Sequence, residues 1–124
     1  METSVHRNVL VVEDDPDCGQ LVVMIVGKAG YGVRLVTSRD DAVTALNCNI
    51  YDFMLMDVRM PGMPLDEFAK FLSGKTRTPK IVIMTAEKDA ASVAKKYNIS
   101  NWIKKPFFPD RLLELLREPS SNPV

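Results

Sequence analysis

The chain has 124 residues, of which 46% are hydrophobic and 26% are charged. These values are typical of one globular domain with its own core, and they exclude a disordered chain. Lys plus Arg and Asp plus Glu are balanced at 16 each, so the formal net charge is zero. This balance argues against nucleic acid or an anionic membrane as a partner, because both favour a basic surface.

The cysteines and the N-terminus indicate a reducing compartment. Cys18 and Cys48 lack the spacing of a disulfide framework or a zinc site. The N-terminus lacks the apolar run of a signal peptide, and no stretch reaches the length of a transmembrane helix. We therefore expect a cytoplasmic protein with two free thiols.

Short apolar runs rich in β-branched residues alternate with stretches of helical spacing. The runs are Val9–Val12, Val33–Val36, Phe53–Met56, Ile81–Met84 and Trp102–Ile103. The first, third and fourth are almost continuously hydrophobic, which is typical of parallel strands covered on both faces. The alternation predicts an α/β domain with a doubly wound parallel sheet.

The stretches between these runs carry helix signals. Asp15 and Pro16 suit the N-cap and first residue of one helix, and Gly30 suits its end. Ser38 can cap a second helix. Further helices are expected over residues 66–72, over residues 89–97 and after Pro109–Asp110. We assign residues 8–118 to one domain and expect loose termini at 1–7 and 119–124, the latter either a linker or a simple end.

Polar residues follow the predicted strands at their carboxyl ends, the edge where open parallel sheets bind ligands. They are Glu13, Asp14, Asp15, Asp57, Thr85, Lys104 and Lys105. Singly, each has an ordinary explanation, such as helix capping or solvation. Together, the carboxylates would repel each other unless a cation such as Mg²⁺ were bound. A hydroxyl and an ammonium beside them could hold a phosphoryl group, so the set suits phosphoryl transfer.

Four motifs surround the predicted strand ends: Val11–Asp15, Met56–Met63, Met84–Ala86 and Lys104–Phe107. They resemble the signatures of response-regulator receiver domains, the CheY-like superfamily of two-component signalling. The motifs occur in the family's order and at the matching strand ends, and the resemblance covers roughly residues 8–117. It implies a flavodoxin-like (βα)5 fold with five parallel strands in the order 2-1-3-4-5 and five helices.

The resemblance also implies an acceptor and a metal site. Asp57 corresponds to the phosphoacceptor. Asp14 and Asp57 would bind Mg²⁺, for which Mn²⁺ can substitute, together with the backbone carbonyl of Arg59. Glu13 would act on the same ion through water.

Further residues correspond to the groups that bind the phosphoryl group and to those that change conformation when it is present. Thr85, the Ala86 N–H and Lys105 would contact the phosphoryl oxygens, and the Lys105–Pro106 bond is expected to be cis. Thr85 and Trp102 correspond to the switch pair of the family. Their movement would change the face formed by the fourth helix, the fifth strand and the fifth helix.

The implied function is a phosphorylatable switch rather than an enzyme with an external substrate. A histidine kinase or histidine phosphotransfer protein would supply the phosphoryl group, and the domain would catalyse its own phosphorylation and dephosphorylation. The changed face would bind a second copy of the domain or an effector, or would control an attached output domain. Direct binding of nucleic acid or membrane by this domain is not expected.

The sequence departs from the family pattern at several positions. Pro64 and Leu65 replace the usual Asp-Gly, so we expect a reshaped loop before the third helix. Asn98 replaces a usual glycine and can keep the left-handed conformation required there. Arg59 and Glu87 are expected to flank the mouth of the site as an ion pair that slows the approach of water, or else to be independent surface charges.

Two other functional classes share parts of this pattern. A receiver-like adaptor would bind its partners without phosphorylation. Against it, the positions that phosphorylation needs are intact, namely Glu13, Asp14, Asp57, Thr85 and Lys105. A flavodoxin-like ligand binder would share the architecture. A flavin site needs a phosphate loop rich in Ser, Thr or Gly after the first strand, whereas Glu13, Asp14 and Asp15 would repel phosphate there.

Overall fold

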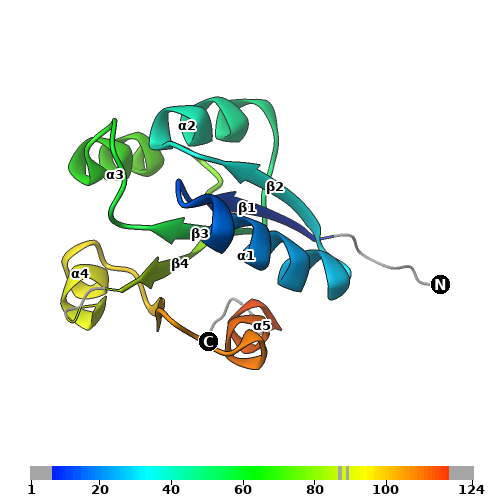
Figure 1. Ribbon diagram of the computed structural model, residues 1–124. Helices are drawn as coiled ribbons and strands as arrows, with labels where there is room; N and C mark the ends of the chain where they lie inside the picture. Colours follow the sequence, from blue (N-terminus) through cyan, green and yellow to red (C-terminus); the bar gives the residue numbers. More distant parts are fainter. Residues whose placement is uncertain (1–6, 87, 89, 118–124) are drawn as a thin grey trace.

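Strands and helices alternate through residues 7–86, 88 and 90–117, the part of the chain that the computed structural model describes (Figure 1). The strands are β1 (Asn8–Val12), β2 (Gly32–Val36), β3 (Phe53–Asp57), β4 (Lys80–Thr85) and β5 (Asn101–Lys104). The helices are α1 (Pro16–Lys28), α2 (Arg39–Cys48), α3 (Leu65–Ser73), α4 (Ala90–Lys96) and α5 (Pro109–Arg117). Each strand and helix expected from the sequence is therefore present.

The strands form one parallel sheet in the order β2-β1-β3-β4-β5, as predicted. Strand order reverses beside β1, which pairs with β2 on one side and with β3 on the other. Val12 of β1 lies opposite Met56 of β3. The next residues, Glu13 and Asp57, are thus brought together at the carboxyl edge of the sheet, where such folds bind ligands.

Helices cover both faces of the sheet, which explains why β1, β3 and β4 are almost continuously hydrophobic. On one face, Val9, Val11, Phe53 and Leu55 pack with residues of α1 and α5. On the other face, Leu10, Val12, Met54 and Met56 pack with residues of α2 and α3. Figure 1 shows these helices on either side of the central strands. The two cores hold the ends of β1 and β3 in fixed positions.

Two of the predicted helix caps are formed. The Asp15 side chain accepts a hydrogen bond from the Asp17 N–H at 3.2 Å, and Ser38 Oγ accepts one from the Asp41 N–H at 3.0 Å. α3 begins at Leu65, one residue earlier than expected, and its N-cap residue Pro64 makes no side-chain cap bond. The loop that enters α3 therefore lacks a side-chain cap of its own.

The described helices are short, and α1 is 13 residues long. Within the residues that are described, none of the helices is long and apolar enough to cross a bilayer. Of the expected loose termini, residues 1–6 and 118–124 lie outside the described part. The Arg7 carbonyl, in contrast, accepts the Gly32 N–H at 2.9 Å.

The end of α4 confirms the conformation expected at Asn98. This residue has a φ of 57°, in the left-handed region. Its N–H donates to the Lys95 carbonyl at 3.1 Å, and the Ile99 N–H donates to the Ala94 carbonyl at 2.8 Å. This pair of bonds is the Schellman arrangement, in which glycine or asparagine avoids most of the steric cost.

We predict that Asn98→Ala lowers the free energy of unfolding by about 1 kcal/mol, because alanine gains no local bond to offset the left-handed backbone. Asn98→Gly should be as stable as the wild type or more so. Urea unfolding measures both variants. Ser100→Ala is the matched control, since Ser100 is exposed and does not have a positive φ. Equal stability of Asn98→Ala and the wild type would contradict the prediction.

Candidate functional site

Three carboxylates converge at the switch point of the sheet. Glu13 and Asp14 directly follow β1, and Asp57 ends β3. Each contributes an oxygen, and these oxygens lie within 4.8 Å of one another. Glu13 is buried, Asp57 is half-buried and Asp14 is exposed. Like charges at this separation raise the energy of the site and favour the binding of a cation.

The ammonium of Lys105 supplies part of the missing positive charge. Its Nζ lies 2.6 Å from Glu13 Oε1 and 3.1 Å from Asp57 Oδ2. The Lys105 N–H donates to the Thr85 carbonyl at 2.8 Å, and the Lys105–Pro106 bond is cis, as expected. Burial disfavours the charged ammonium, but the hydrogen bonds that it donates to Glu13 and Asp57 outweigh this effect and raise the pKa of Lys105. The lysine is thus a permanent cation at neutral pH.

Both oxygens of Glu13 have partners in the protein. Oε1 contacts Lys105, and Oε2 accepts the Asp15 N–H at 3.1 Å. Nearby, burial and the carboxylate of Glu13 raise the pKa of the Cys18 thiol to about 11. Cys18 is therefore a neutral thiol at pH 7 and a poor nucleophile. Its position beside the acidic residues was missed from the sequence, where it reads as an ordinary helix residue.

The carboxylate of Asp57 is held at both oxygens. Oδ2 contacts Lys105, and Oδ1 accepts the backbone N–H of Arg59 at 3.1 Å. The carboxylate is therefore oriented before any ligand binds. Glu87 lies outside the described residues, so the expected ion pair between Arg59 and Glu87 stays a prediction.

The two switch positions lie on neighbouring strands. Thr85 ends β4 and is fully buried, one residue beyond Met84, which pairs with Asp57. Ala86 follows it and is exposed. Trp102 lies on β5 opposite Ile83, is 39% exposed, and lines a hollow of about 540 Å³ between β5 and α5. Thr85 is thus next to the acidic cluster, whereas Trp102 borders the surface.

Arg39 is a site residue that the sequence reasoning missed. It opens α2 and is buried, with 2% of its surface exposed. Its guanidinium donates to the Val58 carbonyl at 2.6 Å and to the Met63 carbonyl at 3.0 Å, on the loop that follows Asp57. A weak signal was available, because a cation at a helix N-terminus opposes the helix dipole and needs another reason to be there.

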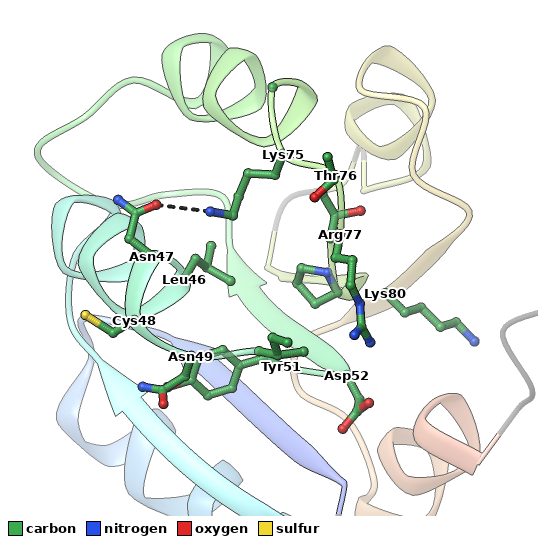
Figure 2. Close-up of a pocket in the computed structure, with 14 residues that line it drawn as sticks. Leu46, Asn47, Cys48, Asn49, Tyr51, Asp52, Lys75, Thr76, Arg77 and Lys80 are labelled. Carbon is green, nitrogen blue, oxygen red and sulfur yellow. Dashed lines mark hydrogen bonds between the residues drawn. The ribbon is translucent and has the colours of Figure 1, made fainter.

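A separate hollow of about 820 Å³ lies at the opposite edge of the sheet, where β3 and β4 begin. Figure 2 shows Lys75, Arg77 and Lys80 around it, and Lys75 Nζ donates to Asn47 Oδ1 at 3.0 Å. None of the acidic or phosphoryl-binding candidates lines this hollow. Despite its size, it is not part of the acidic site.

The sequence matches the response regulator receiver domain over residues 9–117. It is 26% identical over 116 residues to the DNA-binding response regulator MtrA of Mycolicibacterium smegmatis. It is 32% identical over 111 residues to the DNA-binding transcriptional regulator NtrC of Proteus hauseri. The alignments cover 92% and 88% of this chain, but 50% and 24% of the two relatives. The chain thus spans half or less of the length of these proteins.

Solved structures give the same result. The chemotaxis response regulator CheY4 of Vibrio cholerae superposes with a TM-score of 0.81 at 27% identity, covering 91% of this chain and 98% of that one. The response regulator TrrA of Thermotoga maritima, in complex with Mg²⁺ and BeF, has a TM-score of 0.79 at 25% identity, with coverage of 90% and 96%. Because the match runs through every strand end that contributes to the acidic site, this chain belongs to the response regulator receiver domain family.

Proposed function

We propose that this chain is a phosphorylatable switch of a two-component system or phosphorelay, with Asp57 as the phosphoacceptor. The observation that carries the proposal is the environment of Asp57. Its carboxylate lies 3.1 Å from the Lys105 ammonium and close to the oxygens of Glu13 and Asp14. A nucleophilic carboxylate, a cation and a candidate metal site in one place suit phosphoryl transfer. Membership of the receiver family supports the same conclusion.

The donor set fits Mg²⁺, with Mn²⁺ as a substitute. Carboxylate and carbonyl oxygens are the hard ligands that Mg²⁺ prefers, and it commonly uses one or two carboxylates with waters and phosphate oxygens. Asp14 and Asp57 would bind the ion directly with the carbonyl of Arg59, and Glu13 would act through water. When bound, the ion supplies positive charge that neutralises the carboxylates and the phosphoryl oxygens. That TrrA was solved with Mg²⁺ and BeF adds support from a relative.

The reaction requires little covalent chemistry from the other residues. An Asp57 oxygen attacks the phosphorus of a phosphohistidine on a histidine kinase or phosphotransfer protein. The bond from phosphorus to the histidine nitrogen breaks, and an acyl phosphate forms. Lys105 already contacts Asp57, so its ammonium can pair with the incoming phosphoryl group. Thr85 and the Ala86 N–H would donate to the other phosphoryl oxygens.

Hydrolysis at the same site resets the switch. Water attacks the phosphorus, inorganic phosphate leaves, and the Asp57 carboxylate is restored. The domain therefore promotes its own phosphorylation and dephosphorylation, and it does not turn over an external substrate. Arg59, whose N–H donates to Asp57 Oδ1, and Glu87 are proposed modulators of this step, because side chains flanking the mouth of the site would hinder the approach of water.

Output would pass through the face formed by α4, β5 and α5. Thr85 would move toward the phosphate, and Trp102 would turn inward and repack that face. Trp102 and Phe108 expose 39% and 81% of their surfaces there. A second copy, an effector or an attached domain would dock on this face in the cytoplasm. MtrA and NtrC are DNA-binding proteins, but the zero net charge of this chain argues against direct binding of nucleic acid or membrane by this domain.

We predict that acetyl phosphate with Mg²⁺ adds one phosphoryl group, which intact-mass spectrometry detects. Asp57→Asn or a chelator should abolish the adduct, and Asp14→Ala should reduce it strongly by weakening the metal site. Asp17→Asn is the matched control, because Asp17 is an exposed carboxylate outside the cluster. An adduct on Asp57→Asn would place the nucleophile elsewhere. No adduct at saturating Mg²⁺ would favour the adaptor function.

We also predict that Lys105→Met lowers the free energy of unfolding by about 3 kcal/mol without Mg²⁺, since buried Glu13 loses its cation. Glu13→Gln in the same background should recover part of the loss. The pKa of Lys105 is raised above its ordinary 10.5. Its contribution is therefore complete below pH 10.5 and is lost as pH rises through the folded pKa. Denaturant unfolding of the single and double variants tests this, and wild-type stability of Lys105→Met would contradict it.

A further inference from the structure

The loop between β3 and α3 is tied to α2 by Arg39. The guanidinium donates from Nη2 to the Val58 carbonyl at 2.6 Å and from Nη1 to the Met63 carbonyl at 3.0 Å. A longer contact of 3.5 Å joins Nη2 to the Asp57 carbonyl. One side chain therefore reaches both ends of the loop that leads from the phosphoacceptor to α3.

This arginine has an unfavourable electrostatic position. It is 2% exposed, lies at the N-terminus of a helix, and leaves its buried Nε without a hydrogen-bond partner. Among the described residues, all of its hydrogen-bond partners are backbone carbonyls, and no carboxylate lies within ion-pair distance. Burial lowers the pKa of Arg39, and the charge of Asp57 partly opposes this effect. An apolar side chain would fill the same space at less cost.

A single peptide unit connects Arg39 to the carboxylate of Asp57. The carbonyl of the Val58–Arg59 peptide accepts from Arg39, and the N–H of the same peptide donates to Asp57 Oδ1 at 3.1 Å. Because a peptide unit is planar, holding its carbonyl also fixes the direction of its N–H. A cation on the carbonyl side further polarises the N–H and strengthens its bond to the carboxylate.

We infer that Arg39 is a positioning residue of the phosphorylation site, acting on Asp57 through the Val58–Arg59 peptide. The peptide held by Arg39 directly precedes the Arg59 carbonyl, which the proposed function assigns to the metal. Lys105 holds the second oxygen of Asp57 directly. The inference rests on the proposed function. It also explains how the loop before α3 keeps its shape, although its last residue, Pro64, makes no side-chain cap bond to the helix.

The test compares Arg39→Met and Arg39→Lys with Leu46→Ala. Leu46 is a buried residue near the end of α2 and lines the hollow at the opposite edge of the sheet, so its truncation is a control for general destabilisation. The measurements are the Mg²⁺ dissociation constant by titration, the rate of phosphorylation by acetyl phosphate, and the NMR resonance of the Arg59 amide in the metal-free protein. The amide resonance reports its hydrogen bond to Asp57 and would not follow general stability.

Arg39→Met should weaken Mg²⁺ binding by about 10-fold to 100-fold, because removing a group that orients a metal ligand typically lowers metal affinity by this factor. Phosphorylation should slow to a similar extent. In Arg39→Met, the Arg59 amide should lose the NMR chemical shift that its hydrogen bond to the Asp57 carboxylate produces. Arg39→Lys should be intermediate, because an ammonium keeps the charge but not the two-pronged geometry. Leu46→Ala should keep the wild-type affinity and amide resonance.

Wild-type Mg²⁺ affinity and an unchanged Arg59 amide in Arg39→Met, or equal losses in Leu46→Ala, would overturn the inference. If Arg39→Met does not fold, Arg39→Lys decides the question by the same two measurements. Failure of the proposed function would look different, since the wild type itself would then not be phosphorylated on Asp57. The amide measurement on the metal-free protein remains decisive in that case.

Discussion

The ammonium of Lys105, held between Glu13 and Asp57, is the interaction on which the site depends. Three carboxylate oxygens lie within 4.8 Å of one another, and such a cluster requires nearby positive charge. One lysine offsets only part of the negative charge. The remainder favours a divalent ion, yet the lysine keeps the carboxylates in place before that ion arrives. The site is therefore preorganised but incomplete, which suits reversible binding of a metal and a phosphoryl group.

The fold supports this arrangement from both faces of the sheet. The reversal of strand order places β1 beside β3, and apolar residues of α1, α5, α2 and α3 fix both strands. Lys105 arrives from the end of β5, two strands away from Asp57. Arg39 reaches the opposite side of the β3–α3 loop through backbone carbonyls. The position of Asp57 thus follows from the strands, whereas its orientation follows from two cations and one peptide N–H.

Much of this could be predicted from local sequence. Continuous apolar runs indicated buried parallel strands, and Asp15, Ser38 and Asn98 carried caps whose chemistry is local. The acidic cluster followed from topology, because the carboxyl ends of adjacent strands must meet. The partners of Glu13, the position of Cys18 and the role of Arg39 could not be predicted. The bond from Lys105 to Glu13 spans 92 residues of the chain, and Arg39 reaches carbonyls 18 or more residues away. The position of Cys18 depends on the direction of side chains at the end of β1.

A crystal structure of the protein with Mg²⁺ and beryllofluoride would test the central claim most directly. We predict that beryllium bonds to an Asp57 oxygen and that the fluorides contact Lys105 and Thr85. The ion should contact Asp14, Asp57 and the Arg59 carbonyl, with the Arg39 bonds to the loop retained. An adduct on another residue, or an Asp57–Lys105 pair left unchanged at saturating concentrations of both reagents, would contradict it.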